Sequence, residues 1–181
     1  GGKFLTDFFS PVSAFASQVA VQADGKLVVT GYGSNRHFMV ARYMSNGSLD
    51  NTFGSAGQVL TDFGTSRGPT VVNVAIQADG RIIVSGTNDT GSGPQPGAVF
   101  FVERYNSDGS VDRTFGAEGT ASAGIGEVSV AYALALQGDG KIVVVGSVNG
   151  HRNGTAPGDF GVVRFNADGG LDNGFGTGGN V

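Results

Sequence analysis

The chain contains no cysteine among its 181 residues, which excludes disulfide bonds and thiolate metal ligands. Proline is scarce, with 5 residues, so collagen-like and proline-rich linker structures are excluded as well. Charged residues make up 14% of the chain and the formal net charge is −4, which is too small and of the wrong sign for a nucleic-acid-binding surface. No apolar run reaches the roughly 18 residues of a membrane span. We therefore expect neither a nucleic-acid partner nor membrane insertion.

Glycine is abundant instead, with 33 residues, and hydrophobic residues make up 39% of the chain. This hydrophobic fraction is too high for a disordered chain of such modest charge. Many glycines together with valine, phenylalanine and threonine are typical of short strands joined by tight turns. We therefore expect a folded β protein.

Two sequence blocks each occur three times. The first block occupies residues 22–31 (QADGKLVVTG), 77–86 (QADGRIIVSG) and 137–146 (QGDGKIVVVG). The second block occupies residues 42–54 (RYMSNGSLDNTFG), 104–116 (RYNSDGSVDRTFG) and 164–176 (RFNADGGLDNGFG). Successive copies start about sixty residues apart, so one repeating unit extends through the whole chain.

Each unit is expected to contain four strands. The first block predicts a β-hairpin, because Asp-Gly between apolar runs favours a two-residue type I′ turn with positive φ at both central positions. The four strands are predicted at 3–8, 16–22, 26–30 and 38–43, at 58–63, 72–77, 81–85 and 99–105, and at 120–125, 132–137, 141–145 and 160–165. The third strand of each unit is continuously apolar, which indicates burial on both faces.

Four short strands in a repeat of this size are typical of one β-propeller blade. We predict an all-β chain of three antiparallel blades at 3–57, 58–119 and 120–181, the last including the start of a next strand. The pattern Q-x-D-G-K-I-V-V-x-G, followed by R-Y-N-x-D-G-S-L-D-x-x-F-G, resembles the delta-60 repeat family of bacterial β-propellers. The resemblance covers the whole chain, with small departures at Gly138, Arg81 and Gly174. It implies a propeller fold and a secreted or cell-surface location, and it implies no particular activity.

Three blades are fewer than the four to eight with which propellers close. Residues 1–4 and 178–181 lie at the same phase of the repeat, and both correspond to residues 56–59. Two interpretations follow. The chain is a part of a longer propeller, or separate chains join head to tail, as a six-bladed ring of two chains or as a filament.

Every unit carries an arginine and, eight residues later, an aspartate: Arg42 and Asp50, Arg104 and Asp112, Arg164 and Asp172. We expect a bidentate ion pair that fastens the last strand to the turn after it. Because the pair recurs in every unit, a structural role is favoured over a functional one. Phenylalanines 53, 115 and 175, each followed by glycine, are expected to fill the core between blades.

The Asx-rich turns at 106–112 and 166–172 resemble part of a calcium-binding loop, with oxygen-bearing side chains at alternate positions around a glycine. The EF-hand pattern fails, however, because its first ligand position would be Arg104 or Arg164 and its twelfth Phe115 or Phe175. We therefore interpret these segments as ordinary Asx turns and predict no metal site.

Residues with catalytic potential are few. There are three glutamates, Glu103, Glu118 and Glu127, and two histidines, His37 and His151, and each glutamate occurs in one unit only. No nucleophile elbow, zinc motif or phosphate-binding loop is present. We expect no enzymatic activity and no cofactor.

The loops between the third and fourth strands differ from unit to unit. Such variable loops often lie on the binding face of repeat proteins. The candidate ligand-binding residues there are Arg36, His37, Asn88, Asp89, His151, Arg152 and Asp159. The Arg-His pairs could bind an acidic glycan, although solvated loops without a ligand are the favoured interpretation.

The sequence therefore predicts a structural or binding module of a secreted or cell-surface protein. Its partner would be itself, as a homo-oligomer, or adjacent blades of a longer chain. A carbohydrate-binding propeller that uses the variable loops is the alternative, and a glycosidase-like propeller is the third possibility.

Overall fold

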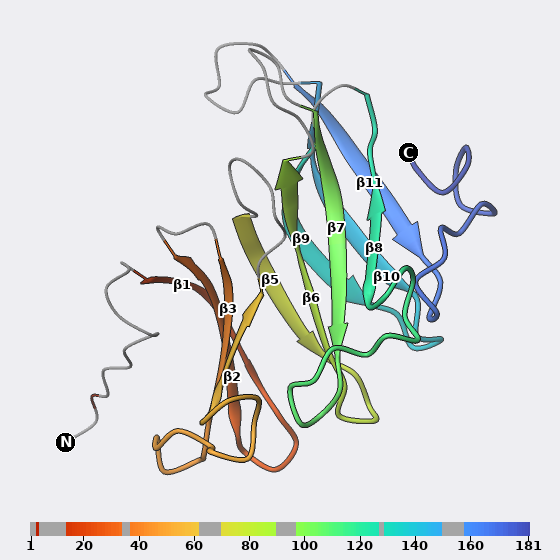
Figure 1. Ribbon diagram of the computed structural model, residues 1–181. Helices are drawn as coiled ribbons and strands as arrows, with labels where there is room; N and C mark the ends of the chain where they lie inside the picture. Colours follow the sequence, from red (N-terminus) through yellow and green to blue (C-terminus); the bar gives the residue numbers. More distant parts are fainter. Residues whose placement is uncertain are drawn as a thin grey trace.

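The computed structural model describes residues 3, 14–33, 37–61, 70–89, 97–126, 129–149 and 158–181. These residues form eleven β-strands and no α-helix, so the all-β prediction is confirmed, and no described segment is a helix able to span a membrane. The strands build three antiparallel sheets that stand side by side (Figure 1). The middle sheet lies between the other two.

The first sheet contains β1 (Ala14–Val21), β2 (Leu27–Gly33), β3 (Phe38–Tyr43) and β4 (Gln58–Thr61). The middle sheet contains β5 (Thr70–Ile76), β6 (Ile82–Asp89), β7 (Ala98–Tyr105) and β8 (Thr120–Ala123). The third sheet contains β9 (Ser129–Leu136), β10 (Ile142–Val148) and β11 (Asp159–Phe165). In each sheet, strands that follow one another in the chain pair with one another, which makes an up-and-down meander.

The sheet boundaries differ from the predicted unit boundaries. Residues 58–61 and 120–123 were predicted to open the second and third units, but β4 pairs with β3, and β8 pairs with β7. The reason is local, because the turn after β3 folds back and the Arg42 amide donates a 2.9 Å hydrogen bond to the Gly57 carbonyl. The strand that follows is thereby laid along the outer edge of the same sheet. The sheets therefore cover 14–61, 70–123 and 129–165 rather than 3–57, 58–119 and 120–181.

The third sheet has the beginning of a fourth strand. Val162 and Val181 exchange two backbone hydrogen bonds of 2.8 and 2.9 Å, and Asn180 bridges to Val163. The predicted stub at the end of the chain thus lies beside β11, at the place that β4 and β8 occupy in the other sheets. The predicted strand at 3–8 lies outside the described residues, except for Lys3.

The hairpin turn was predicted as a two-residue type I′ turn, and this was wrong. The Gly25 amide donates to the Gln22 carbonyl, so the turn is centred on Ala23 and Asp24, and Gly25 alone follows with a positive φ of 81°. This is the three-residue loop with a glycine bulge. The Asp24 carboxylate accepts a 3.1 Å hydrogen bond from the Lys26 amide, which favours this arrangement.

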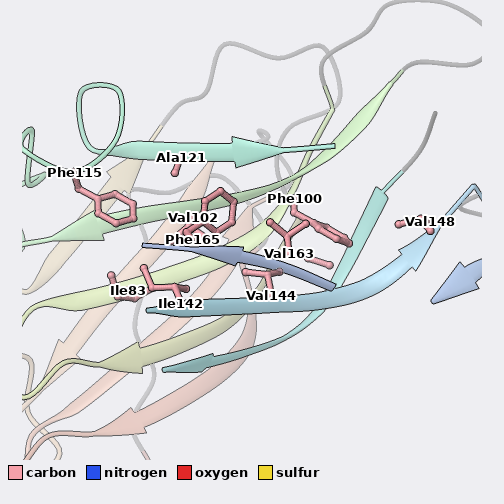
Figure 2. Close-up of a cluster of buried hydrophobic side chains, with 11 residues drawn as sticks. Ile83, Phe100, Val102, Phe115, Ala121, Ile142, Val144, Val148, Val163 and Phe165 are labelled. Atoms are coloured by element: carbon pink, nitrogen blue, oxygen red, sulfur yellow. The ribbon is translucent and has the colours of Figure 1, made fainter. Parts of the chain in front are cut away.

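The hydrophobic core lies in two layers between the sheets. The layer between the first and middle sheets includes Phe38, Phe53, Phe101 and Tyr105. The layer between the middle and third sheets includes Phe100, Phe115 and Phe165, together with aliphatic side chains of β6, β10 and β11 (Figure 2). All the larger contacts between strands of different sheets involve the middle sheet.

Burial of the second strand of each sheet depends on how many neighbours that sheet has. In the middle sheet, residues 82–87 of β6 are all buried, as the apolar pattern predicts. In β10, buried and half-buried residues alternate along the whole strand, and β2 begins with the same alternation. A strict alternation shows that one face of a strand is covered and the other is not. The prediction of burial on both faces therefore holds for the middle sheet alone.

We predict that Phe115→Ala lowers the free energy of unfolding by about 3–5 kcal/mol, because Phe115 is fully buried and its loss leaves a cavity. Phe175 holds the equivalent position but is only half-buried. Phe175→Ala is therefore the matched control and should cost clearly less. Urea unfolding followed by tyrosine fluorescence in dilute solution measures both variants, and equal losses would contradict the prediction.

Candidate functional site

Each sheet carries a cluster of arginine, aspartate and phenylalanine at the end of its third strand. The arginine Nε donates to the aspartate Oδ2 at 2.8 Å for Arg42 and Asp50, and at 2.8 Å for Arg104 and Asp112. Its guanidinium carbon lies 4.6 Å from the ring centre of a phenylalanine, Phe53 in the first sheet. This places a cation over the face of an aromatic ring.

The third cluster is built in the same way. Arg164 donates to Asp172 at 2.7 Å, and its guanidinium carbon lies 4.4 Å from the centre of the Phe175 ring. The structure thus brings every predicted Arg–Asp pair together. The pairs are not bidentate as predicted, because only the Nε of each arginine bonds to the carboxylate.

A second cation reaches each aspartate from the hairpin turn. Lys26 lies 3.2 Å from Asp50, Arg81 lies 3.1 Å from Asp112, and Lys141 lies 3.0 Å from Asp172. These contacts were not predicted, although a basic residue follows Asp-Gly in all three copies of the first block. The Thr52 hydroxyl, together with Lys26 and Arg42, holds the pKa of Asp50 well below its ordinary value of 3.8.

The other end of each guanidinium links neighbouring sheets. The Nη1 atom of Arg42 donates to the carbonyl of Ser107, in the turn after β7 of the middle sheet. The Nη1 atom of Arg104 donates to the carbonyl of Ala167, in the turn after β11, at 2.7 Å. One arginine therefore holds its own sheet together and fastens it to the next one.

Backbone hydrogen bonds run parallel to these arginine contacts. The Gly54 amide donates to the Asp108 carbonyl at 2.7 Å, and the Gly116 amide donates to the Asp168 carbonyl at the same distance. The turn that accepts them packs closely, because a Cβ added at Gly109 would lie 2.9 Å from the Gly54 nitrogen. The two junctions between sheets thus share one geometry.

The first and third sheets carry the same donor and acceptor groups on their outer sides, where the described residues form no further sheet. Arg164 is more exposed than Arg42 and Arg104, with a side-chain exposure of 21% against 7% and 9%. Within the described residues, no carbonyl accepts a hydrogen bond from its Nη1 atom. At the other end of the array, no described donor reaches the carbonyls of the turn at 45–47, which corresponds to the turns at 107–109 and 167–169.

Apolar side chains of β1 and β11 are likewise more exposed than their counterparts at the internal junctions. Val19 and Val21 are 54% and 66% exposed, whereas their counterparts Val74 and Ile76 pack into the layer between the first and middle sheets. Phe160 is 77% exposed, although its counterparts Phe38 and Phe100 are buried. We call the side of the first sheet with Val19 and Val21 the leading face, and the side of the third sheet with Phe160 the trailing face.

Grooves lie between successive hairpin turns. One of about 370 Å³ is lined by Gln22, Lys26, Arg42, Gln77 and Ser107. Another of about 340 Å³ lies between the turns of the middle and third sheets and is lined in part by Gln77, Asp79 and Gln137. Both junctions have such a groove, so the grooves are a product of the packing and do not single out one ligand site.

One buried carboxyl group stands apart from the repeats. Glu103 is 2% exposed, and its carboxyl group accepts a hydrogen bond from the Tyr105 hydroxyl, whose oxygen lies 2.8 Å from the Thr61 hydroxyl. Phe101 and Tyr105 on the same side of β7 belong to the layer facing the first sheet, so Glu103 lies in that junction. Burial raises the pKa of Glu103 to about 7, against the lowering effect of the Tyr105 hydrogen bond.

The candidate ligand-binding residues are only partly described. Arg36, His151 and Arg152 lie outside the described residues, and the side chain of Asp89 does as well. His37 precedes β3, Asn88 lies near the end of β6, and the exposed Asp159 begins β11. They therefore come from three different sheets, and a shared ligand site at this edge stays a prediction.

The Asx-rich turns contain the side-chain hydrogen bonds of ordinary Asx turns. The Asp108 Oδ1 atom accepts hydrogen bonds from the amide and the hydroxyl of Ser110, at 2.9 and 2.7 Å. Asn46 makes the same pair of contacts with Ser48, at 3.0 and 2.8 Å. Across the described part of the chain, no three histidine, aspartate or glutamate side chains gather into a metal-binding group.

Four-stranded antiparallel sheets, packed face to face with one repeat in each, define a β-propeller. A family model described as "Domain of unknown function (DUF5122) beta-propeller" matches residues 22–53, 77–115 and 137–175. The chain belongs to this family of propeller repeats.

The other comparisons add no function. No curated protein matches the chain. Among solved structures, a protein of unknown function from Bacteroides caccae is similar at 11% identity and a TM-score of 0.34, covering 90% of this chain and 67% of its own. A likeness of this degree carries no argument about activity.

We predict that Arg104→Ala lowers the free energy of unfolding by about 3–5 kcal/mol, because it leaves the buried carboxylate of Asp112 without its main partner and breaks the link to Ala167. Arg164→Ala is the control, since Arg164 makes no described contact with a next sheet and is more exposed. Its loss should be smaller when both are measured by urea unfolding in dilute solution. A larger loss for Arg164→Ala would contradict the role assigned to the junction.

We also predict that stability falls as the pH rises from about 4.5 to about 7. Over this interval Glu103 is ionised in the unfolded chain but stays protonated in the folded protein. The free energy of unfolding therefore falls by about 3 kcal/mol, at 1.36 kcal/mol per pKa unit. Below this interval the stabilising contribution of protonated Glu103 to the free energy of unfolding is fully present. Above the interval the free energy lost through Glu103 no longer changes with pH. Urea unfolding at a series of pH values measures the effect, which Glu103→Gln should remove. An unchanged pH dependence in that variant would contradict the assignment.

Proposed function

We propose that this chain is a non-enzymatic structural module whose two open faces pack against further sheets of the same repeat. The observation that carries the proposal is the difference in burial between β6 and β10. The middle sheet, with a neighbour on each side, buries every residue from 82 to 87, whereas β10 buries every second residue. The sequences of these strands are similar, so the end sheets are suited to a neighbour as well.

The energetics favour covered faces. Burying one large apolar side chain stabilises a protein by about 1.5–3 kcal/mol, and Val19, Val21 and Phe160 each stand largely in solvent. The polar groups left at the ends are those that form hydrogen bonds at both internal junctions. An added sheet of the same repeat would supply the partners for both kinds of group.

We further propose that the module belongs to a secreted or cell-surface protein. Support comes from the resemblance of its repeats to the delta-60 family, whose members include large secreted and surface proteins. The chain also has no cysteine to be oxidised outside the cell. In such a protein the module would act as a rigid scaffold, and its variable loops would be free to differ from blade to blade.

A tandem chain tests whether the open faces accept sheets of the same repeat. Residues 5–181 would follow residue 181 directly, because residues 178–181 have the same phase as residues 1–4. A single cysteine is introduced as Val19→Cys, either in the single chain or in the second copy of the tandem. Maleimide should label the single chain quickly at nanomolar concentration and the tandem at least tenfold more slowly, because the sheet before it covers the site.

Arg113→Cys is the matched control, since Arg113 has a 76% exposed side chain in the turn of the middle sheet. Its labelling rate should be the same in the single chain and in the tandem. Equal rates for Val19→Cys in the two proteins would show that the leading face does not take up the preceding sheet, and would refute the proposal.

A further inference from the structure

The proposed function leaves open what covers the two faces, and the following inference depends on it. We propose that a second copy of this chain covers them, by docking the turn at 45–47 of one copy onto Arg164 and Phe175 of the other. The trailing face of each copy thereby meets the leading face of its partner. Such a contact is heterologous, because the two surfaces that meet are different.

The internal junctions define the contacts that the docked turn would make. Where the middle sheet meets the first, the Ser107 carbonyl accepts from Arg42, and the Asp108 carbonyl accepts from the Gly54 amide. Where the third sheet meets the middle one, Ala167 and Asp168 accept in the same way from Arg104 and Gly116. The two junctions agree atom by atom in these contacts, so a third junction of the same kind has a defined register.

Both halves of that third junction are present on this chain. Arg164 and the Gly176 amide correspond to the donors, and within the described residues neither has an acceptor on another sheet. Ser45 and Asn46 correspond to the acceptors, and their carbonyls likewise have no described donor. In the docked pair, Arg164 would donate to the carbonyl of Ser45, and the Gly176 amide would donate to the carbonyl of Asn46.

The apolar surfaces match in the same register. At the internal junctions, the side of a sheet that carries Phe38 or Phe100 packs against the side of the next sheet that carries Val74 or Leu134. On the trailing face, Phe160 occupies the position that Phe38 and Phe100 have in the other sheets. On the leading face, Val19 occupies the position of Val74 and Leu134. The two open faces of one chain are therefore the two halves of a contact that the chain already makes twice.

Two such contacts close a ring. If each copy docks its leading face on the trailing face of the other, two chains give six sheets, which lies within the four to eight blades of known propellers. The arrangement has a two-fold axis and leaves neither open face exposed. A closed dimer is therefore favoured over an open filament, because it buries one more pair of faces for the same number of chains.

Two single-face variants test the direction of docking. Phe160→Glu blocks the trailing face, and Val19→Lys blocks the leading face, because each places a charge at an apolar contact. The unaltered chain should have the mass of two chains by light scattering at micromolar concentration. Each variant alone should be a monomer, and an equimolar mixture should form a one-to-one dimer through the two faces left intact.

Other outcomes overturn the proposal. A monomeric unaltered chain would exclude the second copy as the partner, and the labelling of the tandem chain would still decide separately whether the faces accept sheets of this repeat. One monomeric and one dimeric variant would show that like faces pair. A mixture that stays monomeric, or an unaltered chain that forms long filaments, would refute head-to-tail closure into a ring.

Two further variants separate docking from folding. Arg164→Lys keeps a cation beside Asp172 but loses the fork that reaches the partner's turn, so the dimer dissociation constant should rise about tenfold or more. Arg113→Ala, on an exposed side chain away from both faces, should leave the dissociation constant unchanged. All variants should keep the far-ultraviolet circular dichroism of the unaltered chain, and an unchanged dissociation constant for Arg164→Lys would contradict the proposed register.

Discussion

At each of the two internal junctions, one arginine guanidinium group connects three parts of the fold. Its Nε holds the aspartate of its own sheet, its plane covers a phenylalanine ring, and its Nη1 reaches a carbonyl of the next sheet. Because a single planar group makes all three contacts, the angle between two sheets is fixed by the geometry inside one of them. The apolar layers of the core supply most of the stabilisation, and the arginine determines the register in which those layers meet.

Much of this architecture could be predicted from the sequence, because the repeats show it three times. The second, third and fourth strands, the Asx turns and the Arg–Asp pairs all follow from local patterns. The sheet boundary could not be predicted, because the pairing of β4 with β3 depends on a turn that returns the chain, and a periodic sequence has no marked beginning. The predicted type of hairpin turn was wrong because Asp-Gly also fits a three-residue loop. The Asp24 carboxylate favours that loop by accepting a hydrogen bond from the Lys26 amide.

The contacts between sheets were beyond sequence reasoning for a different reason. The acceptors of the arginine Nη1 atoms are backbone carbonyls of Ser107 and Ala167, which carry no sequence signature and lie more than sixty residues away. In the sequence, Glu103 differs from its surroundings only in having no counterpart in the other two repeats. Its burial beside Tyr105 and Thr61 depends on the packing of the first sheet against β7, which the spacing of residues along one strand does not reveal.

The larger contacts between described strands of different sheets all involve the middle sheet, so the first and third sheets are coupled mainly through it. Stability in such an array is approximately a sum of intrinsic terms for each unit and nearest-neighbour terms for each junction. Fraying at one extremity then need not spread to the other, and partly unfolded states become accessible at free energies below that of global unfolding. The cooperativity of unfolding therefore depends on the number of junctions between sheets, and it increases with every blade that is added.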